Sequence, residues 1–209
     1  MVVCGALAAC ARCAYLYHPN TVGAKMRFHA CKALVCGVLV CTAIVFSSPP
    51  ARAGRTSWEA GLQAGASFNE EDESFHQYDL LASYGLPWSW QWGRAVQVDT
   101  RLTTVLGVLE GGGDAGLEAS LGFEFVFGRA SGDGPFQLRA GSALTLLSED
   151  EFGDEDFGGP LQFTHHISLH YWFLQNLSAV ARVQHMSNGG IYDENPGLNM
   201  IMLALVYLF

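Results

Sequence analysis

A histidine and a serine lie two residues apart near the C-terminal end of the chain, at His185 and Ser187. Residues two apart in an extended strand project from the same face, so the imidazole can approach the hydroxyl. A base beside a serine is the minimum arrangement for nucleophilic attack on an acyl group. The following Asn188 and Gly189 offer an amide side chain and a backbone N–H to a developing oxyanion. These four residues are therefore a candidate catalytic site for ester cleavage.

The chain around this pair alternates between apolar and small or polar residues, which predicts strands. Eight segments carry the alternation: Ser57–Phe68, Phe75–Tyr84, Arg94–Val108, Gly116–Phe127, Phe136–Leu147, Leu161–Phe173, Leu177–Ser187 and Asn199–Phe209. Such strands exceed the ~5–6 residues usual in soluble sheets and suit a tilted crossing of a ~25 Å apolar band. The sequence therefore predicts an all-β fold, an eight-stranded antiparallel transmembrane β-barrel. A soluble lipocalin-like barrel is the alternative.

The connections between these segments alternate in character. Four hold most of the acid: Asn69–Ser74, Leu109–Asp114, Ser148–Pro160 and Asn188–Leu198. Both termini of an even-stranded barrel lie in the periplasm, so we expect the acidic connections to be external. The connection Gly85–Gly93 is then a periplasmic turn, and its tryptophans, together with Trp58, are expected in an interfacial girdle. These tryptophans are Trp88, Trp90 and Trp92.

Residues 1–53 have the pattern of an N-terminal extension and a signal peptide. A basic start at Met26 is followed by the apolar run Ala33–Phe46, which is too short to span a bilayer. The segment that ends at Ala53 supplies the small residues that a signal peptidase requires. We therefore expect translation to begin at Met26, cleavage to follow Ala53, and residues 54–209 to form the barrel.

Composition narrows the chemistry of the mature chain. All six cysteines precede the expected cleavage site, so neither a disulfide framework nor a thiolate metal site is predicted. From Gly54 onward, six arginines stand against twenty acidic residues, a formal charge of −14. This balance argues against nucleic acid as a partner.

The last segment places Leu203, Leu205, Tyr207 and Phe209 on one face, and the chain ends on this phenylalanine. Bacterial outer-membrane barrels have similar endings. The ending therefore predicts the bacterial outer membrane as the location and the barrel assembly machinery as a transient partner. The sequence leaves open whether the barrel is a monomer or a homodimer.

The segment around the candidate site resembles the lipid A 3-O-deacylases, acyloxyacyl-hydrolase-like outer-membrane barrels with a His-x-Ser-Asn motif before the last strand. The resemblance rests on Arg182–Ile191 and Asn195–Gly197. It implies that Ser187 is the nucleophile, His185 its general base and Asn188 an oxyanion donor. It also implies a cofactor-independent esterase that removes the ester-linked 3-hydroxyacyl chain at the 3 position of lipid A in lipopolysaccharide.

One position departs from that family pattern. The acidic member of the triad is expected twelve residues after the serine, where this chain has Asn199. An amide can orient an imidazole, but it does not stabilise an imidazolium as a carboxylate does. The third residue is therefore open between Asn199, Asp193 and Glu194.

Three further histidines, His165, His166 and His170, suggest a metal site. Successive residues of a strand face opposite sides, so only His166 and His170 share a face, and two ligands are too few. No metal is therefore expected. The acidic runs are predicted to be solvated loops, or alternatively to share divalent cations with lipopolysaccharide phosphates.

A second function remains open, because a fold alone does not define an activity. The chain could be a non-enzymatic small outer-membrane barrel with a structural or ligand-binding role, in which His185 and Ser187 are ordinary strand residues. Asn199 in place of the acid favours this alternative. A pore is disfavoured, because side chains normally fill the interior of an eight-stranded barrel.

Overall fold

The computed structural model describes residues 57–68, 73–93, 95–129 and 134–209. The extension, signal peptide and cleavage site predicted over residues 1–53 lie outside these described residues. Among the described residues, no helix has the length and apolar character that crossing a membrane requires.

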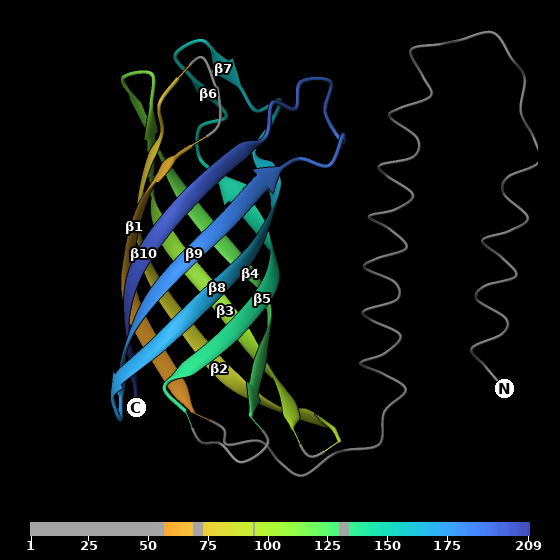
Figure 1. The fold of residues 1–209 in the computed structure, drawn as a ribbon. Coiled ribbons are helices and arrows are strands. Elements are labelled where there is room, and N and C mark those ends of the chain that lie inside the picture. The colour runs from red at the N-terminus through yellow and green to blue at the C-terminus, as the bar shows by residue number, and fades with distance from the viewer. Residues whose placement is uncertain (1–56, 69–72, 94, 130–133) are drawn as a thin grey trace, which may run out of the picture.

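Eight long antiparallel strands close into a barrel (Figure 1), which confirms the predicted fold class. They are β1 (Trp58–Ser67), β2 (His76–Trp92), β3 (Val96–Gly111), β4 (Asp114–Arg129), β5 (Phe136–Leu147), β8 (Leu161–Leu174), β9 (Leu177–Ser187) and β10 (Leu198–Leu208). Their order around the wall is β1-β10-β9-β8-β5-β4-β3-β2, so the first strand pairs with the last. Closure gives every strand two neighbours, as the backbone of a membrane-spanning sheet requires.

The prediction for the three tryptophans was wrong, because β2 continues through all of them to Trp92. A turn was predicted over Gly85–Gly93, but the chain passes through a register shift between Gly85 and Ser89 and then pairs with β3 again. A bulge can absorb a proline that donates no ladder hydrogen bond. β2 therefore ends at Trp92, and β3 begins at Val96.

The external connections differ in size. Gly112 and Gly113 alone join β3 to β4, with φ angles of 58° and 91° that suit a two-residue hairpin of glycines. The connection between β5 and β8 contains a short hairpin that was not predicted, β6 (Glu151–Phe152) paired with β7 (Glu155–Asp156). Figure 1 shows this hairpin, the β3–β4 turn and the β9–β10 connection at one end of the barrel, opposite the C-terminus.

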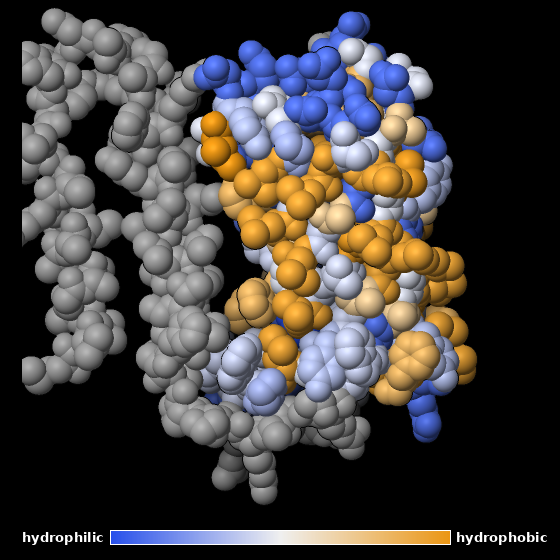
Figure 2. Space-filling model, turned by 180° about the vertical axis from the view of Figure 1, so that it is seen from behind, coloured by the Kyte–Doolittle hydropathy of each residue, from blue (hydrophilic) through white to orange (hydrophobic). Residues whose placement is uncertain are grey.

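The outward face of the wall is apolar over most of its height. The last strand follows the predicted alternation, with Leu203, Leu205 and Tyr207 exposed and Met202 and Val206 buried. Figure 2 shows the resulting apolar band, with hydrophilic residues gathered at the end that carries the β6–β7 hairpin. The band identifies this surface as the one that faces lipid.

The interior of the barrel has an apolar zone and a polar zone. Near the external end, a cluster of nine buried residues includes three aromatic rings packed edge to face. The cluster comprises Phe75, Leu109, Leu147, Phe152, Phe157, Met186, Leu198, Met200 and Met202. This cluster, the apolar plug, contains residues from the external connections as well as from the strands.

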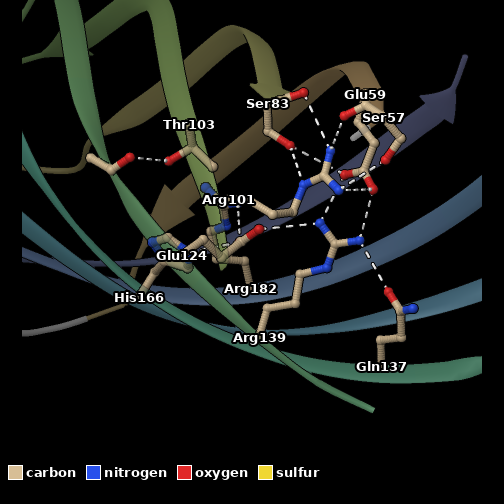
Figure 3. Close-up of polar contacts among 11 residues, drawn as sticks. Ser57, Glu59, Ser83, Arg101, Thr103, Glu124, Gln137, Arg139, His166 and Arg182 are labelled. Atoms are coloured by element: carbon tan, nitrogen blue, oxygen red, sulfur yellow. Dashed lines mark hydrogen bonds and ion pairs between the residues drawn. The ribbon is translucent and has the colours of Figure 1, made fainter. Parts of the chain in front are cut away.

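Below the apolar plug, the lumen holds a buried network of charges (Figure 3). Arg139 lies 2.8 Å from Glu59 and 3.1 Å from Glu124, and Arg101 lies 3.3 Å from Glu59. A cavity of about 30 Å³ lies between the side chains of this zone.

Candidate active site

The candidate site lies at the external ends of β9 and β10, which are neighbours in the wall (Figure 1). Gln184 and Met186 of β9 are buried in the barrel. The intervening His185 is exposed and Ser187 is half-buried. The pair therefore shares the outward, lipid-facing side of the strand, as the period of two predicted.

Asn199 lies directly opposite His185 in the register of β9 and β10. The Nδ1 atom of His185 is 2.8 Å from Oδ1 of Asn199. An amide oxygen only accepts hydrogen bonds, so Nδ1 carries the proton and donates it. The Nε2 atom is then unprotonated and available to accept a proton. Asn199 thus occupies the place of the orienting third residue.

The two alternative acidic residues, Asp193 and Glu194, are exposed in the connection between β9 and β10. In the part of the chain that the structure describes, neither side chain forms a hydrogen bond or an ion pair with His185. Glu194 instead contributes its backbone carbonyl to the connection. Of the three predicted third residues, Asn199 is the one that hydrogen-bonds the imidazole among the described residues.

Ser187 ends β9 and lies opposite Phe163 of β8. Among the described residues, no hydrogen bond joins its hydroxyl to His185. The Cα atoms of residues two apart in a strand are about 7 Å apart, a separation that an imidazole can bridge from the same face. Nucleophile and base often come into contact only when substrate is bound.

Asn188 has a different environment from the one predicted for an oxyanion donor, because its side chain is fully buried. Its Nδ2 donates to the carbonyls of Phe157 and Glu194, at 2.9 and 2.6 Å. Its Oδ1 accepts a hydrogen bond from the backbone N–H of Gly190 at 2.8 Å. The amide therefore ties the β9–β10 connection to the β5–β8 connection, and both of its N–H groups are already used.

Two glycines of this connection lie next to the pair. Gly189 follows Asn188 with a φ of 66°, and no hydrogen bond of its backbone N–H is found among the described residues. Gly197 has a φ of 77°, and a Cβ built on it would lie 3.1 Å from Cε1 of His185. The approach of Gly197 to the imidazole was not predicted, and the Asn-Pro-Gly stretch is the feature of the sequence that could have indicated it.

The other three histidines of β8 face opposite sides of the wall, as the alternation predicted. His166 and His170 are buried in the lumen, where Nε2 of His166 is 3.1 Å from Oε1 of Glu124. His165 is half-buried on the outward face. No group of three or more His, Cys, Asp or Glu side chains suited to a metal ion is found in the described ranges.

A sequence model of the lipid A 3-O-deacylase (PagL) family matches residues 76–207, which is more than half of the chain and contains the whole candidate site. The chain belongs to this family. Family membership agrees with the resemblance drawn from the His-x-Ser-Asn motif and gives the outward-facing pair a chemical context.

Two PagL proteins illustrate the relationship. Lipid A deacylase PagL of Bordetella bronchiseptica is 35% identical over 74 residues, which are 35% of this chain and 42% of that protein. The match therefore spans less than half of this relative. A crystal structure of the outer membrane enzyme PagL has a TM-score of 0.62 at 23% identity, and the match covers 71% of this chain and 98% of that one. The second likeness supports the transmembrane barrel fold.

Proposed function

We propose that the protein is an outer-membrane esterase that hydrolyses the 3-O-linked acyl chain of lipid A, with Ser187 as nucleophile and His185 as general base. The observation that carries this proposal is the position of the pair. An imidazole oriented at Nδ1 by Asn199 and a serine hydroxyl share the lipid-facing side of the wall at its external end. A glycolipid of the outer leaflet presents its ester bonds at this level.

The proposed reaction has two steps. Oγ of Ser187 attacks the ester carbonyl while Nε2 of His185 takes the hydroxyl proton, and the same proton passes to the departing sugar oxygen. A water molecule then attacks the acyl-enzyme with His185 again as base, which releases the fatty acid and restores Ser187. Both steps need only the protein and water, so no cofactor is invoked.

The oxyanion of each step needs hydrogen-bond donors near Ser187. We assign the backbone N–H of Gly189 to this role, because it is two residues from the nucleophile and has no hydrogen bond among the described residues. The Asn188 amide can join it only by releasing the carbonyl of Phe157 or Glu194. Without that release, Asn188 is a positioning residue that holds the connection carrying Gly189.

The proposal extends to the assembly of the barrel. The exposed row Leu203, Leu205 and Tyr207 and the terminal Phe209 support recognition of β10 by the barrel assembly machinery. Whether the folded barrel acts as a monomer or as a homodimer is measurable by the mass of the detergent-solubilised protein.

The test is mass spectrometry of lipid A incubated with the folded barrel and with Ser187→Ala. We expect the wild type to remove one ester-linked acyl chain and Ser187→Ala to leave lipid A intact. Thr104→Val is the matched control, because Thr104 is an outward hydroxyl on β3 that bonds only the carbonyl of Ser120. Unchanged lipid A with folded wild type would refute the esterase, and full activity of Ser187→Ala would refute the nucleophile.

One observation favours the alternative of a non-enzymatic barrel, namely the amide of Asn199 in the place of a carboxylate. An amide gives a protonated His185 no charge to pair with, so the rate falls. The same mass spectrometry separates the two functions, because a structural barrel leaves lipid A unchanged at every enzyme concentration.

A further inference from the structure

The lumen of the barrel contains a row of polar side chains that is separate from the candidate active site. The register places Gln63 of β1 opposite Asp79 of β2, and Asp79 opposite Gly107 of β3. Gly107 in turn lies opposite Glu118 of β4. The three polar side chains are each only 5% exposed. Four neighbouring strands therefore carry two buried carboxylates and one buried amide in one row, with a glycine between the carboxylates.

The glycine leaves room for the two carboxylates to approach each other. A Cβ atom built on Gly107 would overlap Oδ1 of Asp79, so this oxygen lies over the glycine. Facing residues of adjacent strands have Cβ atoms about 5 Å apart, which brings the carboxylate of Glu118 within reach of the same space. The side chain of Gln77 interacts with both carboxylates, and its Nε2 is 2.9 Å from Oδ2 of Asp79. Asp79 and Glu118 are therefore neighbours across the gap at Gly107.

Three oxygen atoms of this row receive no hydrogen bond from the described part of the protein. They are Oε1 of Gln63, Oδ1 of Asp79 and Oε2 of Glu118, and all three are buried. Nε2 of Gln63 donates to Oδ2 of Asp79 at 2.6 Å, so Oε1 of the same amide lies beside this carboxylate. A buried polar group without a partner is costly, and a buried charge is more so. Three acceptors in one place indicate a positively charged partner.

The charges of the lumen lead to the same conclusion. Among the described residues, its almost wholly buried charged side chains are three arginines and four carboxylates, a formal charge of −1 with the histidines counted as neutral. The arginines form their ion pairs with Glu59 or Glu124, and none found in the described ranges joins Asp79 or Glu118. One further positive charge beside Asp79 and Glu118 would balance the lumen. The arginines are Arg101, Arg139 and Arg182.

The chemistry of the three oxygens distinguishes between the possible partners. Carboxylate and amide oxygens are the ligands of hard cations. A proton shared by the two carboxylates would supply the charge, but it would leave Oε1 of Gln63 without a partner. Gln63 and Glu118 line the cavity of about 30 Å³, a volume that is sufficient for one small ion or water molecule. Arg182 lines the same cavity, and its charge favours a singly charged ion over a divalent one.

We propose that Gln63, Asp79 and Glu118 bind one monovalent alkali cation, such as Na⁺, inside the barrel. The cation links β1, β2 and β4 across the gap at Gly107. The apolar plug adjoins the site, because Leu147 of the plug lies opposite Glu118 in the register. The site stabilises the folded barrel and is independent of the proposed esterase.

The test is urea unfolding of the folded barrel in detergent, in NaCl and in choline chloride at equal ionic strength. A ligand that binds only the folded state multiplies the folding constant by one plus the ratio of its concentration to its Kd. We expect an increase approaching about tenfold between about 10 and about 100 mM Na⁺, and none with choline. Glu118→Gln keeps the size of the side chain but removes its charge, and it should abolish the response to Na⁺. Glu110→Gln removes an equal charge from an exposed position of β3 and is the matched control that keeps the response.

Three outcomes of this experiment would overturn the site. Equal folding constants in NaCl and choline chloride would show that no alkali cation binds. A response that Glu118→Gln retains would place the cation elsewhere. Folding constants that depend on pH but not on Na⁺, with a dependence that Glu118→Gln removes, would show that the two carboxylates share a proton instead.

Diffraction keeps the inference testable if Glu118→Gln does not fold. Tl⁺ occupies sites for monovalent cations and scatters anomalously, so it can be located in crystals of the wild-type barrel. We expect an anomalous peak between Oε1 of Gln63, Oδ1 of Asp79 and Oε2 of Glu118. Peaks at the acidic external connections alone would overturn the site.

Discussion

Polar side chains in the lumen and on the outer wall of this barrel have different surroundings. In the lumen, Arg139 is held between Glu59 and Glu124 within 3.1 Å, and the three side chains are almost wholly buried. On the wall, the hydrogen bond to Asn199 is the one that His185 forms among the described residues. In the lumen, Arg139 pairs with both carboxylates, which stabilises one arrangement of these three side chains, whereas the wall keeps hydrogen-bonding capacity for a ligand. Removal of a charged side chain in the lumen should therefore lower the stability of the barrel. Removal of a polar side chain at the site on the wall should lower the rate of hydrolysis.

The largest expected effect is on the wall. His185→Ala removes the proposed base, and we expect activity on lipid A to fall at least about 10³-fold, as in other serine hydrolases that lose a catalytic residue. The exposed side chain contributes little packing, so the urea midpoint of unfolding should stay close to that of the wild type. Activity within tenfold of wild type in a folded variant would contradict the role of His185.

In the lumen, Arg139→Met should lower the free energy of unfolding by about 3–5 kcal/mol, because Glu59 and Glu124 are left buried without their common partner. Urea titration in detergent or liposomes measures this change. The refolded fraction should retain lipid A hydrolysis, which distinguishes this region from the wall. A variant as stable as wild type would show that the lumen network contributes no stability.

Asn199 lies on the wall beside His185 and orients this proposed base without adding a charge. Asn199→Asp should raise kcat by about tenfold or more, because a carboxylate stabilises the imidazolium that forms during attack. Asn199→Ala should lower kcat, and Asp193→Ala should leave it unchanged because Asp193 does not contact His185. A rate for Asn199→Asp below that of wild type would mean that the neutral amide is preferred at this position.

The smallest expected effect is that of two glycine substitutions, whose comparison distinguishes backbone strain from a contact with the base. Gly197 and Gly190 have φ angles of 77° and 80°, so alanine at either position should cost about 1–2 kcal/mol of stability. Only Gly197→Ala brings a Cβ against the His185 imidazole, whereas Gly190 has open space. Kinetics on lipid A should therefore show a several-fold loss for Gly197→Ala alone. Equal kinetics for the two variants would mean that the close approach of Gly197 has no effect on the base.

Much of the barrel could be predicted because strand alternation is a local property. The limits of β5 and β9 match the predicted segments, and the outward row of β10 follows its apolar period. The same local reasoning failed at Trp88, Trp90 and Trp92. A periplasmic turn was predicted there, but pairing with β3 resumes beyond the bulge. Whether a strand continues past a bulge depends on its neighbour, which the local pattern does not contain.

The candidate site could likewise be predicted only in part. Spacing within one strand was enough to place His185 and Ser187 on a common face, and the family resemblance pointed to Asn199 as one of three candidates for the third residue. Spacing was not enough for Asn188, whose amide bonds Phe157 of a distant connection. A side-chain amide forms whichever hydrogen bonds its buried surroundings offer, and those surroundings come from a segment 31 residues away.

The sequence by itself determined that alternate side chains face lipid, that a histidine and a serine share one such face, and that residues 54–209 are acidic. These properties follow from the period of an extended strand and from composition. Only the tertiary structure decided that His165 lies opposite His185, that Asp193 and Glu194 form no hydrogen bond with it among the described residues, and that Gly197 approaches its ring. Barrel closure and register determine which residues of different strands face each other, and both arise from the cooperative pairing of all eight strands.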